Sequence, residues 1–230
     1  MPVEQYRSCK TLEELWAEVY TLNRRIDPGN TLIPIVGNGQ TKIPKAMFVF
    51  INPTIRNSSS SPSWKGPRFP FVGTRQVWGV FFRAGLFDEE LYYRIKHGTD
   101  WSLGFTRAVL NHLKKRSFYF TNIVKWTGSD AALPSTKKIA TFLPILQREI
   151  EIVKPKMIVT FGHIPFTHLT KKKIVFEEYY QKVMREDTIS SFDCQVCPCD
   201  ARVVPCYFPV GRGNPLRAVH ILSKLAPVLQ

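Results

Sequence analysis

A short apolar run that stops abruptly in a polar loop is the feature that most constrains the fold of this chain. Residues 47–51, MFVFI, have the length and the β-branched and aromatic content of a buried strand. Asn52-Pro53-Thr54 follows at once, and a loop rich in Ser, Pro and Lys leads to the turn FPFVG at 69–73. In open α/β sheets, active sites collect where parallel strands end. Asn52 is therefore a candidate site residue, and the aromatic turn offers a flat face that would suit a nucleobase.

Three further apolar runs indicate strands, and helical patterns lie between them. The predicted strands cover residues 118–124, 157–161 and 203–207. The predicted helices cover residues 11–26, 77–96 with a break at Gly85, 135–153 and 215–226. The first helix opens with a capping box formed by Thr11 and Glu14. This alternation predicts a βαβ architecture with a mostly parallel, four-stranded central sheet.

We expect one domain over residues 1–230, with an N-terminal helical segment at 1–30. Residues 171–193 are basic and then acidic without a clear period, so we interpret 171–200 as a variable insertion. Polar side chains or loops follow the four predicted strands: Asn52, Asn122, His163 and residues 208–214. They should converge on one edge of the sheet.

Composition favours a globular protein with a polyanionic partner. With 44% hydrophobic and 13% aromatic residues, a chain of 230 residues can bury one sizeable core. The formal net charge of +14 and the pI of about 9.7 favour DNA or RNA, although many basic proteins bind neither. No apolar run approaches the ~20 residues of a membrane span, and no signal-peptide pattern begins the chain. We therefore expect a cytoplasmic protein without a membrane partner.

Four segments, in order, resemble the uracil-DNA glycosylase superfamily. They are IPIVGNGQTKIPKAMFVFINPT, PFVGTRQVWGVFFRAGLF, YFTNIVKW with PSTKKIATFLPILQREIEIVKPKMIVTFG, and PCYFPVGRGNPLR. The second and third are similar to family 4 of that superfamily. The resemblance spans residues 32–225 and implies a three-layer α/β/α fold in a DNA repair enzyme.

Three departures from family 4 stand out. The first strand ends in Asn52-Pro53, which is closer to the mismatch-specific and single-strand-selective members. The iron-sulfur cysteines are missing, and Trp126 stands where one of them would be. Phe208 occupies the place of the His in the last motif. We therefore expect no cofactor and slower or altered catalysis.

The resemblance implies a role for each residue of the site. Asn52 would orient the water that attacks C1′, and Phe71 would stack on an extruded base. The Asn122 amide would pair with N3–H and O4 of uracil, while Ile51 and Phe208 would complete the base pocket. The alternatives are that Asn52 is a simple turn residue, that Asn122 caps a backbone turn at the strand end, and that Phe71 is a core aromatic that packs the turn.

A second group of residues is predicted to contact DNA. The glycines of the loop at 211–214 would let the backbone approach the minor groove, with Arg212 filling the vacated stack or binding phosphate. The predicted DNA contacts are Gly211, Arg212, Asn214, Arg75 and Lys125. The alternatives are a flexible basic turn and solvated surface charges.

Cysteines crowd near the C-terminus at positions 194, 197, 199 and 206. CQVC has the spacing of half a zinc site, but no matching second pair follows. A short cysteine-bearing hairpin without metal is the preferred interpretation, with a bound zinc or iron-sulfur cluster as the alternative.

The leading hypothesis is a monomeric, monofunctional DNA glycosylase that removes uracil by hydrolysis and leaves an abasic site. Within the same class, the base could be another deaminated one such as hypoxanthine. From a different class, Phe208 favours a protein that binds DNA or a damaged base without cutting it. A nucleotide-binding α/β protein is a third reading, and the absence of a GxxxxGK[ST] loop opposes it.

Overall fold

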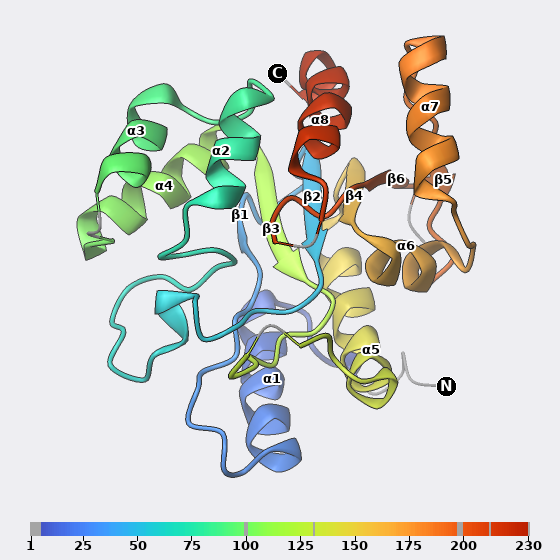
Figure 1. Cartoon of the computed structure of the whole chain (residues 1–230). Helices are drawn as coiled ribbons and strands as arrows, with labels where there is room; N and C mark the ends of the chain where they lie inside the picture. Colours follow the sequence, from blue (N-terminus) through green and yellow to red (C-terminus); the bar gives the residue numbers. More distant parts are fainter. Residues whose placement is uncertain (1–5, 99–100, 131, 197–199, 212, 230) are drawn as a thin grey trace.

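A six-stranded sheet forms the centre of the molecule (Figure 1). The computed structural model describes residues 6–98, 101–130, 132–196, 200–211 and 213–229. The strand order is β1-β3-β2-β4-β6-β5. The four inner strands are β2 (Ala46–Phe50), β3 (Phe118–Asn122), β4 (Met157–Phe161) and β6 (Arg202–Cys206), and they run parallel to one another. They are the four strands predicted from the apolar runs, with ends that differ by a few residues.

The prediction of four strands is wrong at the two sheet edges. β1 (Asn38–Gly39) pairs antiparallel with β3, and β5 (Phe192–Asp193) pairs antiparallel with β6. Each edge strand is only two residues long. A segment this short carries no periodicity, so only its pairing partner makes it a strand.

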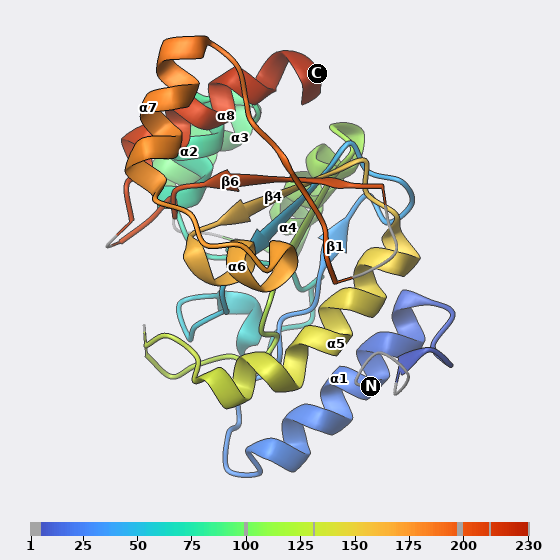
Figure 2. The same ribbon diagram turned by 90° about the vertical axis from the view of Figure 1, so that its right-hand side faces the viewer.

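The two faces of the sheet support separate hydrophobic cores, as expected for a three-layer fold. Phe48 and Phe50 point into one core, whereas Met47 and Val49 point into the other. The first core is covered by α2 (Gln76–Arg83), α3 (Glu89–His97), α4 (Leu103–Lys115), α7 (Phe176–Glu186) and α8 (Pro215–Leu229). The second is covered by α1 (Leu12–Ile26), α5 (Thr136–Val153) and α6 (His163–Thr170). Figure 2 shows α7, α8 and α2 on one side of the sheet and α6, α5 and α1 on the other.

The helices with clear end signals form where the sequence predicts them. At the start of α1, Thr11 Oγ1 accepts from Glu14 N at 3.2 Å and Glu14 Oε2 accepts from Thr11 N at 3.1 Å, which confirms the capping box. The helical pattern at 77–96 divides into α2 and α3. The break includes Gly85, which has φ +72°, a conformation that glycine adopts without strain.

Three helices were missed: α4, α6 and α7. α6 begins at His163, which was interpreted as part of a loop after the strand, and its eight residues are too few to show a clear period. α4 carries Phe105, Val109 and Leu113 toward the core, and Ser102 caps its first turn. α7 lies inside the region interpreted as a variable insertion without a clear period, and its residues Phe176, Tyr179 and Val183 are buried at helical spacing. The charged residues of α4 and α7 hide these apolar stripes, because most of each of these two helices faces water.

The described part of the chain contains no helix that is both long enough and apolar enough to span a bilayer.

Candidate active site

The ends of the parallel strands bring the predicted residues to one edge of the sheet. Asn122 is the last residue of β3 and pairs in register with Phe50, two residues before Asn52. A β-carbon added to Gly162, which follows β4, would lie 3.8 Å from Ile51 Cδ1 and 3.9 Å from Phe208 Cβ. The edge formed by β2, β3, β4 and β6 therefore gathers Asn52, Asn122, Ile51 and Phe208, as expected.

Asn122 carries a buried polar atom that the protein leaves unpaired. The residue is only 1% exposed, and its Nδ2 has no hydrogen-bond partner among the described residues. An unpaired buried polar group costs about 1–3 kcal/mol and calls for an explanation; Asn23, Arg68, His112 and Arg116 also carry such atoms. In this conformation a ligand reaches the amide only after neighbouring side chains move aside.

Asn52 keeps one side of its amide free. Its Nδ2 donates to Pro53 O at 3.1 Å, while no described group donates to its Oδ1. The backbone here is fixed, because Gly128 N donates to Pro53 O at 3.0 Å and Ile55 N donates to Gly128 O at 2.8 Å. Asn52 thus offers a half-buried carbonyl acceptor in a defined position.

Phe71 is held in a strained backbone conformation. Its φ is +71°, which costs a bulky residue of order 1–3 kcal/mol. Its carbonyl accepts from Trp78 Nε1 at 3.2 Å and from Thr74 Oγ1 at 2.9 Å, and these bonds hold the turn. The half-buried ring packs edge-on against Phe50, with centroids 4.6 Å apart. Strain retained at an aromatic residue beside this edge is typical of a functional position.

The loop after β6 folds tightly around Phe208. A β-carbon at Gly213 would lie 1.9 Å from Phe208 O, so no other residue fits without moving the loop. Gly211 is exposed with φ +59°, and Asn214 Oδ1 accepts from Arg217 N at 3.1 Å to start α8. Arg212, predicted to contact DNA, lies outside the described residues.

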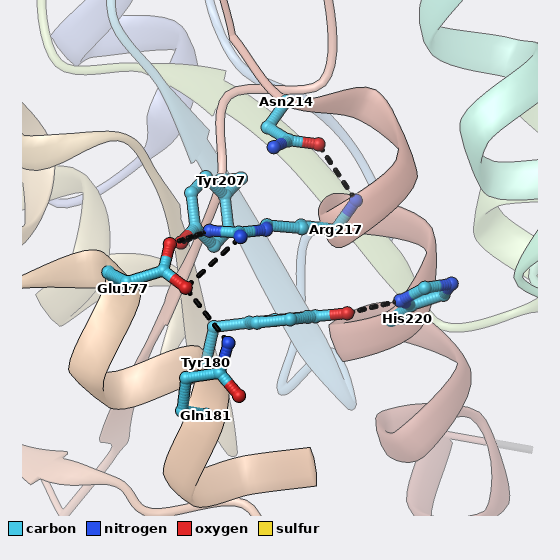
Figure 3. A network of polar contacts seen from close by, with 7 residues as sticks. All are labelled: Glu177, Tyr180, Gln181, Tyr207, Asn214, Arg217 and His220. Atoms are coloured by element: carbon cyan, nitrogen blue, oxygen red, sulfur yellow. Dashed lines mark hydrogen bonds and ion pairs between the residues drawn. The ribbon is translucent and has the colours of Figure 1, made fainter.

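A polar network joins the two ends of this loop to α7 (Figure 3). Arg217 donates to Tyr207 Oη at 2.8 Å and to the Glu177 carboxylate, with Nη2 to Oε1 at 3.1 Å. Its guanidinium also lies 4.6 Å from the Tyr180 ring centroid, and Tyr180 Oη is 2.6 Å from His220 Nδ1. The hydrogen bonds from Arg217 lower the pKa of Glu177. Tyr207 before the loop and Arg217 after it are thereby both held against α7.

A comparison with protein families agrees with this geometry. The model described as the Uracil DNA glycosylase superfamily matches residues 36–220, which include the four inner strands and the candidate site. The chain belongs to the uracil-DNA glycosylase superfamily. Among curated proteins, nothing matches it significantly. The resemblance at the superfamily level is confirmed, and the likeness to family 4 stays a prediction.

Membership makes DNA the expected partner, but one predicted DNA contact is wrong. Lys125 is fully buried, and its Nζ donates to Glu149 Oε2 at 2.5 Å and to Asn122 O at 2.6 Å. It has no surface to offer a phosphate. Burial lowers the pKa of Lys125, although the Glu149 carboxylate acts in the opposite direction. In this glycosylase fold, Lys125 instead fixes the strand end that carries Asn122.

Sequence reasoning also missed the partner of Lys125. Glu149 is fully buried on α5, and its Oε1 accepts from Tyr119 Oη and from Thr121 Oγ1, each at 2.8 Å. The Glu149 carboxylate fits here because residue 37 is a glycine; a β-carbon at this position would lie 2.1 Å from Glu149 Oε1. The sequence did offer one indication of this pair, because Glu149 lies beside Ile150 on the apolar face of a predicted core helix, and a buried carboxylate requires a partner.

The remaining predicted contacts have mixed outcomes. Arg75 is exposed before α2 and donates to Gly98 O at 3.1 Å, so its position stays compatible with a phosphate contact. Cys206 packs in the core beneath α8, where burial raises the pKa of its thiol, while Cys194 packs against the opposite core. One metal cannot hold both. Cys197 and Cys199 lie outside the described residues.

We expect Glu149→Ala to destabilise the protein by about 3–5 kcal/mol, because it leaves the buried Lys125 ammonium without its counterion. The free energy of unfolding in urea measures this loss. The double variant Lys125→Met/Glu149→Leu is the control, since it removes both charges and should be much less destabilised. Equal losses in the single and double variants would contradict the assignment.

Proposed function

We propose that the protein is a monofunctional DNA glycosylase that hydrolyses the N-glycosidic bond of uracil in DNA and leaves an abasic site. The observation that carries the proposal is the unpaired, buried Nδ2 of Asn122. It lies at the sheet edge that also holds Asn52. A buried donor kept without a protein partner is explained if a ligand supplies the acceptor.

Base recognition follows from the donor and acceptor pattern of the Asn122 amide. Uracil presents O4 as an acceptor and N3–H as a donor, so Nδ2 and Oδ1 match adjacent groups on one base edge. The base must leave the helical stack to reach them. Phe71 would stack on the extruded base, and its fixed turn keeps the ring in place before the base arrives.

Bond cleavage requires a positioned water more than a strong base. The C1′–N1 bond breaks with its electron pair leaving on the uracil, and the water oxygen bonds to the cation-like C1′ while its proton passes to solvent. Asn52 Oδ1 would accept a hydrogen bond from this water and aim it at C1′. Lys125 lies three residues after Asn122, but it is buried in an ion pair with Glu149 and is therefore not available for Schiff-base chemistry.

Phe208 is the observation that favours a second candidate. The leaving base carries negative charge on O2, and a phenyl ring donates no hydrogen bond to it. A missing donor of this kind typically costs about 10²–10³ in rate. A DNA-binding protein without glycosylase activity is therefore the alternative, and hypoxanthine is the alternative base within the enzyme class.

We expect Asn52→Ala to lower the rate of base release by roughly 10²–10⁴, the usual contribution of a group that orients or deprotonates the nucleophile. Alkali-revealed cleavage of labelled oligonucleotides carrying one uracil, hypoxanthine or mismatched thymine measures it. Asn52→Asp is the matched control, because its carboxylate still accepts from the water. Unchanged release by Asn52→Ala, in protein that melts like wild type, would remove Asn52 from the mechanism.

Phe208→His should accelerate uracil release by up to about 10²–10³, because it restores a donor toward O2. Phe208→Leu separates this effect from simple opening of the pocket and should give no acceleration. If wild type and Phe208→His both release no base yet bind uracil-containing DNA tightly, the binding-protein alternative replaces the enzyme.

A further inference from the structure

A cationic groove lies between α4 and the loop that joins Asn52 to Phe71. Its volume is about 490 Å³, and its lining comprises Lys65, Gly66 and Pro67 on the loop and Arg107, Leu110, Asn111 and Lys114 on α4. Asn52, Asn122 and Phe208 are not part of this lining. The groove is therefore separate from the candidate active site, although one wall belongs to the same loop.

Both walls of the groove are held in place without a ligand. Residues 107, 111 and 114 follow helical spacing and so share one face of α4. On the loop, Trp64 Nε1 donates to Pro67 O and Arg68 Nη2 donates to Trp64 O, each at 3.1 Å. Gly66 turns closely over the indole, since a β-carbon there would lie 2.9 Å from the Trp64 ring. A ligand would therefore bind to a groove whose two walls are already ordered.

The charges around the groove are of one sign. Lys65, Arg107 and Lys114 are exposed, and none of them forms an ion pair with a described residue. Among the described residues, no Asp or Glu belongs to the lining. Like charges held around one hollow repel one another, and a polyanion relieves this repulsion.

We propose that this groove binds backbone phosphates of the DNA strand that flanks the nucleotide in the active site. The inference rests on the proposed DNA substrate. The guanidinium of Arg107, the two ammonium groups and the Asn111 amide all donate to phosphate oxygens, and Leu110 offers an apolar contact for a deoxyribose. No aromatic ring lines the groove, so it is suited to a sugar-phosphate chain rather than to a stacked base.

The position of Lys65 links this contact to the site. The loop begins after Asn52 and ends at Phe71, and hydrogen bonds fix it along its length, including Asn57 Nδ2 to Phe69 O at 2.9 Å. A strand held at the groove is thereby placed relative to both site residues. Phosphate contacts of this kind fix register without reading sequence.

The test is the salt dependence of binding to undamaged DNA, which needs no base release. Fluorescence anisotropy over about 50–200 mM salt compares wild type with Lys65→Gln/Arg107→Gln/Lys114→Gln. The slope of log K against log salt is negative, and each lost phosphate contact lowers its magnitude by about 0.7–0.9, so the magnitude should fall by roughly 2–3 in the triple variant. The charge-matched control, Lys171→Gln/Lys172→Gln/Lys173→Gln, neutralises an exposed run after α6 and should keep the wild-type slope.

Equal slopes in the triple variant and wild type, or equal losses in the triple variant and its control, would overturn the groove proposal. Base release gives an independent readout. On a long oligonucleotide at moderate salt the triple variant should release uracil more slowly than its control, whereas on an oligonucleotide of a few nucleotides the two should agree. If wild type releases no base but the slopes differ as expected, the groove stands and the proposed enzymatic function fails.

Discussion

The buried ion pair between Lys125 and Glu149 is the interaction on which the site depends. Lys125 Nζ bonds the main-chain carbonyl of Asn122, and Glu149 fastens that lysine to α5 while accepting from Tyr119 and Thr121. Burying two charges is expensive unless their hydrogen bonds are satisfied. In this network both charged groups are hydrogen-bonded at the end of β3, and the backbone that carries Asn122 is held rigidly.

Two energetically unfavourable features occur at the site. Asn122 Nδ2 is buried without a partner, and Phe71 keeps a positive φ. Such features also occur elsewhere in the described chain, for example the unpaired Asn23 Oδ1 and the positive φ of Ser117. What distinguishes these two is their position beside Asn52 at the ends of the parallel strands, which is consistent with a site where a ligand completes the hydrogen bonds.

Much of the fold and part of the site could be predicted. The four inner strands, the capped helices and the convergence of Asn52, Asn122, Ile51 and Phe208 follow from apolar runs that end in polar residues. The edge strands β1 and β5 could not, because two residues carry no period. The prediction that Lys125 contacts DNA was wrong because a lysine just after a strand is normally exposed. Its burial becomes evident only from its ion pair with Glu149 on α5, which is distant in sequence.

The sequence by itself determined the α/β class, the superfamily and the edge of the sheet where the site lies, because periodicity, strand ends and motif order are local properties of the chain. Only the tertiary structure decided which polar groups are paired. Asn122 Nδ2 has no hydrogen-bond partner among the described residues, Lys125 is paired with the Glu149 carboxylate, and Lys65 lines an open groove. Each of these outcomes depends on residues that are distant in sequence. Long-range packing sets those neighbours, and with them the burial and charge that govern function.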